Sequence, residues 1–277
     1  MQVIVADNCG FCPGVRNAIS MAEKVLETQK TVYSLGQLIH NKDVVDELAD
    51  KGLKTVENVD EIHNGTVLIR SHGAAPAQIE QLKKRGLNII DATCVLVKRV
   101  QKLAAELASE GYKIVVIGDE NHPEVKAVVG CANDVVVIGS ENDIHKLPED
   151  ARLGILGQTT QGHEQFGKIV GAIAAGGFRE LKIINTLCRE TINRQKAAIK
   201  LCKQVDVMFV LGGLNSANTR KLVELCKMYN PQTFHLQNWS EFDKRMVFHK
   251  QKAGVTAGAS TPDWIIDEFV ENLREIR

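Results

Sequence analysis

The sequence lacks several features that would assign it to a common class of protein. Its 277 residues carry 34 basic and 34 acidic side chains, so the net charge is zero, and no block of lysine and arginine marks a surface for nucleic acid or membranes. It has no run of apolar residues long enough for a transmembrane helix. Its N-terminal stretch, which includes V-I-V-A-D at residues 3–7, lacks the charged and apolar regions of a signal peptide. We therefore expect a cytoplasmic protein without a nucleic-acid or membrane partner.

Two nucleotide-binding motifs are also missing. The chain has no G-x-x-x-x-G-K-[ST] pattern, and the stretch L-G-G-L-N-S-A-N lacks the spacing of G-x-G-x-x-G. The seven cysteines are an odd number, and in a reducing compartment they are expected to be thiols or metal ligands rather than disulfides. They lie at positions 9, 12, 94, 131, 188, 202 and 226.

The chain does contain a pattern that occurs three times. A short β-branched run ends near a cysteine, and a helical pattern follows it, at Cys12, Cys94 and Cys188. Two further strand-like runs follow each of these cysteines, and they end in polar residues. These strand ends carry the other candidate site residues, which are His40, His72, His122, Glu124, Thr159, Thr160, Ser216, Asn218 and Ser260.

Strand, polar tip and helix thus alternate nine times, in three groups of three that each open with a cysteine-ended strand. Such alternation predicts an α/β protein with parallel sheets. We expect three small, similar domains, 1–94, 95–188 and 189–277, arranged with pseudo-threefold symmetry. Ligands of parallel sheets bind beyond the carboxyl ends of the strands. This arrangement would therefore bring the three cysteines together at a central site and surround them with the polar strand-end residues. Helices are expected at 42–49, 125–129 and 219–227, and from residues 78, 165 and 263.

Three converging cysteines favour a thiolate metal site. Zinc sites have four closed ligands, or three and a water molecule, and zinc signatures gather their ligands in C-x-x-C pairs. A [4Fe–4S] cluster prefers four cysteines, so three would leave one iron open to act on a substrate oxygen. The residues alone leave both metals as hypotheses, together with an iron–sulfur sensor, a zinc-thiolate hydrolase and a non-redox [4Fe–4S] hydro-lyase.

The other strand-end residues favour an anionic substrate. Histidines, hydroxyls, an amide and helix N-termini together suit a phosphate or diphosphate group. Glu124 is the carboxylate best placed at a strand tip, and it could give a proton to a leaving hydroxyl. Each of these residues could also be a simple helix cap.

Nine short motifs in order make the chain similar to a known family. F-C-P-G-V, Q-L-I-H-N, S-H-G, D-A-T-C, N-H-P-E, Q-T-T, N-R-Q, N-S-A-N and A-G-A-S-T-P resemble those of the 4-hydroxy-3-methylbut-2-enyl diphosphate reductases. The resemblance covers residues 9 to about 270. It implies a two-electron, two-proton reductive removal of hydroxide from an allylic diphosphate at a [4Fe–4S] cluster. A ferredoxin or flavodoxin would supply the electrons.

The resemblance also implies a role for each matching residue. Cys12, Cys94 and Cys188 would hold the cluster, and Glu124 would deliver a proton to the hydroxyl that Thr159 positions. His122 would contribute to the substrate pocket and its proton network, with Thr160 beside Thr159. The diphosphate would bind to His40, His72, Ser216, Asn218 and Ser260.

Three positions depart from the motifs of the family. Val95 follows the second cysteine, where a proline is common. Cys9 is an extra cysteine, which we expect to lie near the cluster without binding it. Ala217 stands where a second serine is common, which removes one hydroxyl from the expected diphosphate site. Cys202 and Cys226 lie in apolar helical patterns and are expected in the core.

Overall fold

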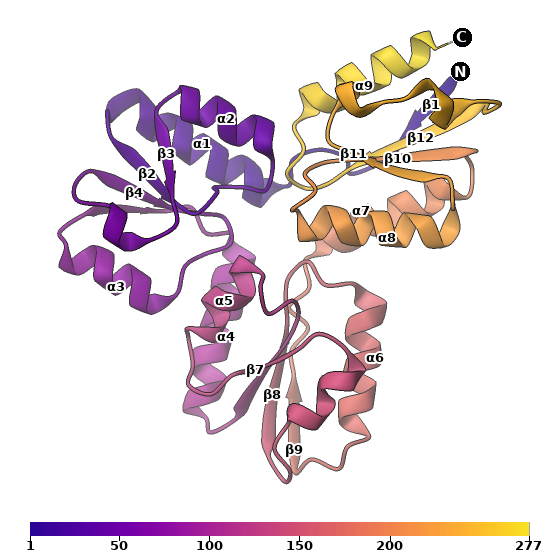
Figure 1. Cartoon of the computed structure of the whole chain (residues 1–277). Coiled ribbons are helices and arrows are strands. Elements are labelled where there is room, and N and C mark those ends of the chain that lie inside the picture. The colour runs from indigo at the N-terminus through magenta and orange to yellow at the C-terminus, as the bar shows by residue number, and fades with distance from the viewer. Residues whose placement is uncertain (277) are drawn as a thin grey trace. The chain divides into compact units, whose positions relative to one another are not determined.

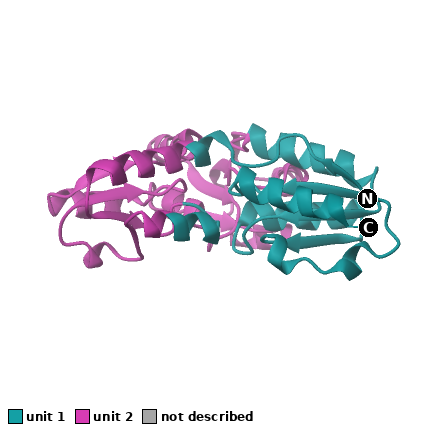
Figure 2. Cartoon of the chain, turned by 90° about the horizontal axis from the view of Figure 1, so that it is seen from above, with its two compact units in different colours: residues 1–16, 39–47, 189–277 teal, residues 17–38, 48–188 magenta. Residues whose placement is uncertain are grey.

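The computed structural model describes residues 1–276 and contains three four-stranded parallel sheets with helices between the strands (Figure 1). The predicted α/β class with parallel sheets is therefore confirmed. The chain divides into two compact units, coloured separately in Figure 2. Unit 1 comprises residues 1–16, 39–47 and 189–277, and unit 2 comprises residues 17–38 and 48–188.

Unit 1 contains one sheet. Its strands, in order across the sheet, are β1 (Gln2–Val5), β12 (Lys252–Ala257), β10 (Val207–Leu211) and β11 (Thr233–Leu236). Its helices are α7 (Arg189–Cys202), α8 (Ala217–Tyr229) and α9 (Asp263–Glu275). The central strand β10 reads V-M-F-V-L and is buried throughout, as expected of a parallel strand with both faces covered. Phe209 packs into the apolar cluster that includes α9, while Met208 packs into the cluster with α7 and α8.

Unit 2 contains the other two sheets. One has the strand order β3 (Leu53–Val56), β2 (Val32–Leu35), β4 (Thr66–Ile69) and β5 (Asn88–Asp91). The other has the order β7 (Val136–Ile138), β6 (Lys113–Ile117), β8 (Arg152–Gly157) and β9 (Glu180–Ile183). The remaining helices are α1 (Pro13–Thr28), α2 (Lys42–Asp50), α3 (Pro76–Lys84), α4 (Val95–Ser109), α5 (Pro123–Val129) and α6 (His163–Ala174), of which α1 and α2 begin in unit 1.

The three sheets share one order of elements, which extends the repeat seen in the sequence. In each sheet one outer strand, β3, β7 or β11, has three or four residues. It is followed by a short 3-10 helix before the chain returns to a central strand. These 3-10 helices are Val59–Glu61, Glu141–Lys146 and Trp239–Glu241, and a fourth one covers Lys244–Val247. The strands β3, β7 and β11 were not predicted from the sequence.

The sequence analysis grouped each cysteine-ended strand with the two strands that follow it, and this grouping is wrong. β5, which precedes Cys94, pairs with the preceding strand β4, and β9, which precedes Cys188, pairs with β8. β1, which precedes Cys12, pairs with β12 near the other end of the chain. The cysteine-ended strand therefore completes a sheet rather than opening one. The domain borders at residues 94 and 188 stay a prediction.

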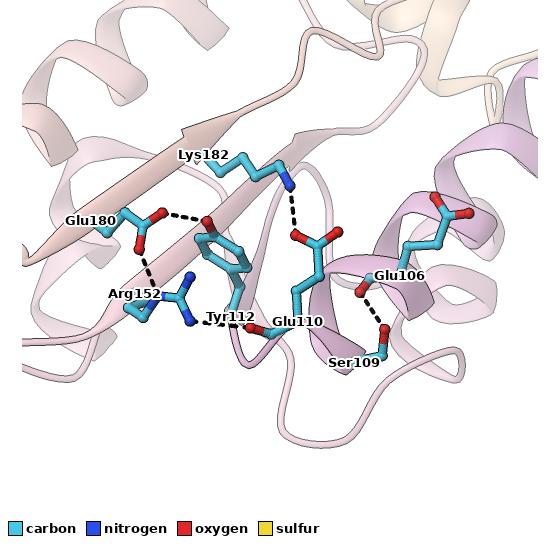
Figure 3. A network of polar contacts seen from close by, with 7 residues as sticks. All are labelled: Glu106, Ser109, Glu110, Tyr112, Arg152, Glu180 and Lys182. Atoms are coloured by element: carbon cyan, nitrogen blue, oxygen red, sulfur yellow. Dashed lines mark hydrogen bonds and ion pairs between the residues drawn. The ribbon is translucent and has the colours of Figure 1, made fainter.

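A polar network fastens the amino ends of the strands in the β6–β8–β9 sheet (Figure 3). The Tyr112 hydroxyl donates to Glu180, whose other carboxylate oxygen accepts from Arg152 Nε at 2.6 Å. The Arg152 guanidinium lies 4.4 Å from the centre of the Tyr112 ring, and Lys182 Nζ donates to Glu110 at 2.6 Å. Because ligands of parallel sheets bind at the carboxyl ends, we assign this network to stability. In the described residues no helix is long and apolar enough to span a membrane.

Candidate active site

Each of the three cysteines that are predicted to bind the cluster makes an equivalent backbone hydrogen bond. The N–H of Cys94 donates to the carbonyl of Ser71 at 3.0 Å, that of Cys188 to Thr159 at 2.8 Å, and that of Cys12 to Ala259 at 3.0 Å. In each case the acceptor lies just beyond the carboxyl end of the neighbouring strand in that sheet. The three cysteines therefore occupy equivalent positions in the three sheets.

Each of these cysteines also lies directly before a helix. Cys12 precedes α1, Cys94 is the N-cap residue of α4, and Cys188 precedes α7. All three are half-buried and none of them forms a disulfide, and Cys12 Sγ accepts a hydrogen bond from the N–H of Val15 at 3.5 Å. The N-terminus of a helix favours negative charge on a nearby group, so these positions suit thiolate ligands.

The other cysteines differ from these three. Burial raises the pKa of the Cys9 thiol to about 11, against an opposing effect of Arg194, so Cys9 stays protonated near neutral pH. Its side chain packs against the apolar cluster of β10, β12 and α9. Cys202 and Cys226 are buried in the cluster between α7, α8 and the sheet, which confirms their expected place in the core. Cys9 therefore fits the core better than a metal site.

A second equivalent position lies after the central strands β2, β6 and β10. A glycine follows each of these strands, at Gly36, Gly118 and Gly212. Its N–H donates to the carbonyl of the last residue of β3, β7 or β11, respectively. Four residues after each glycine comes a predicted site residue, and these are His40, His122 and Ser216. His122 and Ser216 are the N-cap residues of α5 and α8. The polar tips predicted from the sequence thus stand at matching places in the three sheets.

Glu124 is held by Thr159 inside unit 2. One carboxylate oxygen accepts from the N–H of Thr159 at 2.6 Å, and the other lies 2.7 Å from the Thr159 hydroxyl. The Glu124 residue is only 1% exposed. Burial raises its pKa to about 7, although the two hydrogen bonds from Thr159 oppose the rise. Near neutral pH this carboxyl is therefore able to hold a proton and to release it.

Two predicted histidines lie together in the same unit. The rings of His72 and His122 meet edge to face, with their centres 5.4 Å apart. His122 Nδ1 accepts from the N–H of Glu124 at 3.2 Å, which requires an unprotonated Nδ1. In the neutral ring the proton is then on Nε2, which becomes a donor for an anionic group.

Unit 1 holds the remaining polar residues. The Ser260 hydroxyl donates to the carbonyl of His40 at 3.0 Å, and Ser216 Oγ accepts from the N–H of Thr219 at 3.3 Å. Asn218 is 8% exposed, and within residues 1–276 its buried Nδ2 donor has no hydrogen-bond partner. An unsatisfied buried donor in the first turn of α8 favours an anion at this position.

The structure brings the site residues into two groups, one in each unit. Cys12, His40, Ser216, Asn218 and Ser260 belong to unit 1, and the other predicted residues belong to unit 2. Three supporting residues were missed from the sequence. Ser71 donates to the carbonyl of Leu38, Gln158 donates to Thr160, and Arg194 is described below. Each lies inside a quoted motif, S-H-G, Q-T-T or N-R-Q, so the motifs themselves were the available signal.

Comparison with known proteins supports the resemblance. The family model described as "LytB protein" matches residues 3–274. The 4-hydroxy-3-methylbut-2-enyl diphosphate reductase of Geobacter sp. (strain M21) is 43% identical over 278 residues, which cover 100% of this chain and 98% of that protein. The enzyme of the same name from Aquifex aeolicus is 41% identical and covers 100% of this chain and 97% of its own length.

Two solved structures match as well. The structure described as (E)-4-hydroxy-3-methyl-but-2-enyl diphosphate reductase, the terminal enzyme of the non-mevalonate pathway, has a TM-score of 0.72 and 41% identity, covering 100% of both chains. The E-1-hydroxy-2-methyl-but-2-enyl-4-diphosphate reductase from Plasmodium falciparum has a TM-score of 0.95 and 30% identity, covering 99% of this chain and 88% of that one. The chain therefore belongs to the LytB family.

Proposed function

We propose that the chain is a 4-hydroxy-3-methylbut-2-enyl diphosphate reductase. It takes up two electrons and two protons, releases the hydroxyl of the substrate as water, and forms isopentenyl or dimethylallyl diphosphate. The observation that carries the proposal is the full-length match to relatives with this name, in a chain where Glu124 is buried and bound to Thr159. A proton donor of this kind is what the release of a hydroxide requires.

The proposed cofactor is a [4Fe–4S] cluster held by Cys12, Cys94 and Cys188. These cysteines fit the group because none of them is in a disulfide, each makes an equivalent backbone hydrogen bond, and each lies directly before a helix. When bound, the cluster supplies electrons and one iron with an open position. The cysteines follow the edge strands β1, β5 and β9, and their N–H groups bond to the segments just beyond the largely buried strands β12, β4 and β8.

The proposed diphosphate site consists of His40, His72, Ser216, Asn218 and Ser260. The unsatisfied Nδ2 of Asn218, the N-terminus of α8 and the serine hydroxyls are donors, as an anion requires. His122 adds an Nε2–H donor in its neutral form, and the Thr160 hydroxyl accepts a hydrogen bond from Gln158 Nε2 at 2.9 Å. Ala217 contributes no hydroxyl, so Ser216 and Asn218 carry this part of the site.

Proton delivery is assigned to Glu124 with Thr159. The carboxyl is neutral in part near pH 7 because burial raises its pKa to about 7. The Thr159 hydroxyl bonds to this carboxyl in either protonation state, since a hydroxyl can donate or accept. Thr159 can therefore pass a proton between Glu124 and the hydroxyl of the substrate.

Two further parts of the proposal concern the surroundings. We propose a ferredoxin or a flavodoxin as electron donor and a location in the cytoplasm. The cytoplasm is supported by the three site cysteines, none of which forms a disulfide, because a reducing compartment keeps thiols available for a cluster. The donor is supported by the resemblance to the family.

The test is an anaerobic assay on the purified protein with the allylic diphosphate. The proposal predicts turnover to the two five-carbon diphosphates only when a reduced ferredoxin, a reduced flavodoxin or a chemical reductant is added. Turnover without any reductant would contradict it and favour a hydro-lyase instead. Absence of turnover by a protein shown to hold the cluster would also contradict it.

A further inference from the structure

The motif N-R-Q contains a buried arginine that the proposed function leaves without a role. Arg194 lies in α7, in the helix that begins directly after Cys188. It is only 3% exposed, in the part of α7 that faces the interior of unit 1. Arginine is rarely buried to this extent unless its guanidinium makes specific hydrogen bonds.

The guanidinium of Arg194 joins the loop before Cys12 to the end of strand β12. Its Nη1 donates to the carbonyl of Ala257 at 2.8 Å, and its Nη2 donates to the carbonyl of Gly10 at 2.8 Å. Gly10 lies two residues before Cys12, and Ala257 ends β12 three residues before Ser260. The rigid, planar fork of arginine suits two acceptors at once, which a lysine ammonium does less well.

The loop before Cys12 is also bonded to the loop that follows β12. The N–H of Cys12 donates to the carbonyl of Ala259, in the loop that carries Ser260. The loop before Cys12 is irregular, with positive φ angles of 58° at Asn8 and 86° at Gly10. No regular element fixes such a segment, so a few hydrogen bonds determine its path.

Attachment of α7 to the protein does not require this arginine. Ala198, Leu201 and Cys202 of α7 are buried in the apolar cluster with α8 and β10. The contacts of Arg194 are instead directed at the backbone beside two proposed site residues. A charged side chain used only for packing would not need to reach both loops.

We propose that Arg194 is a positioning residue that holds the loop of Cys12 and the loop of Ser260 in the geometry needed for the cluster and the diphosphate. This inference rests on the proposed function for its ligands, but the contacts of Arg194 exist without them. Residues that support a metal ligand in this way typically change metal retention by about 10–100-fold when they are replaced.

The first experiment uses the metal-free protein and measures amide hydrogen exchange. Arg194→Met should speed exchange in residues 9–12 and 257–260, with the N–H of Cys12 most affected, while the strands of unit 1 stay protected. Lys196→Met is the matched control, because it removes one positive charge from an exposed position of the same helix. Unchanged exchange in both loops of the arginine variant would overturn the inference, whatever the protein binds.

The second experiment measures the rate at which the reconstituted protein loses iron to a chelator under anaerobic conditions. Arg194→Met should lose iron about tenfold faster than the wild type or more, and Arg194→Lys should be intermediate because it keeps the charge and one of the two bonds. The KM of Arg194→Met for the diphosphate should rise as well, since the Ser260 loop is also released.

A generally destabilised variant separates positioning from stability. Leu273→Ala removes a fully buried side chain from α9 in unit 1 and should lower the melting temperature without faster iron loss. If iron loss follows melting temperature across all variants, or if Arg194→Met keeps iron like the wild type, the inference is wrong. If the wild type itself binds no [4Fe–4S] cluster, the proposed function fails, and the exchange experiment still decides the role of Arg194.

Discussion

At the scale of the residue, Glu124 is the group on which the proposed chemistry depends most. It is 1% exposed, and both of its carboxylate oxygens are bound by one residue, Thr159. A carboxyl that must deliver a proton near neutral pH needs a pKa near that value, and burial provides it. The sequence alone predicted that Glu124 is the proton donor. It could not predict the pKa, which depends on the packing of distant segments around it.

Glu124→Gln should abolish most of the activity and leave the cluster in place. The amide keeps the size of the side chain and can still accept from the N–H of Thr159, but it has no proton to deliver. We expect the turnover number to fall by about 10²–10⁴-fold, with iron and sulfide content unchanged. Glu120→Gln, at an exposed position nearby, serves as the control and should behave like the wild type. Turnover near the wild-type rate in Glu124→Gln would contradict the assigned role.

The same carboxyl predicts how stability depends on pH. Its pKa in the folded protein is raised from 4.5 to about 7, chiefly because of burial, so between these values the folded protein binds a proton that the unfolded chain has lost. Its contribution to stability is therefore complete below the unfolded pKa and is lost as the pH rises through the folded pKa. A rise of this size corresponds to about 3 kcal/mol.

Urea unfolding of the metal-free protein measures this effect. Between about pH 5 and about pH 9, the free energy of unfolding of the wild type should fall by up to about 3 kcal/mol more than that of Glu124→Gln, whose amide does not titrate. All other titrating groups are common to both proteins, so the difference isolates Glu124. Identical pH dependence in the two proteins would show that the folded pKa of Glu124 is not raised.

At the scale of the element, the sequence predicted the helices, the central strands and the outer strand that ends near a cysteine in each sheet, but it missed the other outer strand. Helices expected at 42–49, 125–129 and 219–227 are found at Lys42–Asp50, Pro123–Val129 and Ala217–Tyr229. The missed strands β3, β7 and β11 are outer strands of three or four residues that are only partly buried, which leaves too few positions for a clear pattern. The pairing of β1 with β12 joins opposite ends of the chain, and no local pattern contains that information.

The polar network at the amino ends of β6, β8 and β9 should affect stability alone. Tyr112→Phe removes the hydroxyl that donates to Glu180 and leaves the ring in place (Figure 3). The loss of one hydrogen bond should lower the melting temperature by about 2–4 °C, without any change in turnover or iron content. A loss of activity in a variant that remains folded would mean that this end of the sheet takes part in the reaction.

At the scale of the whole molecule, the repeat explains why three cysteines 82 and 94 residues apart were recognised as one set. Their equivalent hydrogen bonds to Ala259, Ser71 and Thr159 give that set a structural basis within each sheet. The sequence could not distinguish zinc from an iron–sulfur cluster, because three thiols alone suit both. Membership of the LytB family, together with the names of its relatives, favours the cluster.

Substitution of single cysteines tests the set. Cys94→Ser should lose the cluster or hold it only weakly, since a serine hydroxyl does not replace a thiolate ligand. Cys131→Ser is the matched control, because Cys131 is a half-buried thiol outside the repeat, whose Sγ donates to the carbonyl of Ala127. Cys9→Ser should also retain the cluster. Full iron and sulfide content in Cys94→Ser would mean that another cysteine is the ligand.

The most direct test of the central claim is a Mössbauer spectrum of the protein, purified without oxygen and enriched in ⁵⁷Fe, with and without the allylic diphosphate. The account predicts about four irons and four sulfides per chain, with the signal of one iron changed by the substrate, as expected of a cluster with three cysteine ligands. Zinc without sulfide, or four irons that do not respond to the substrate, would contradict it.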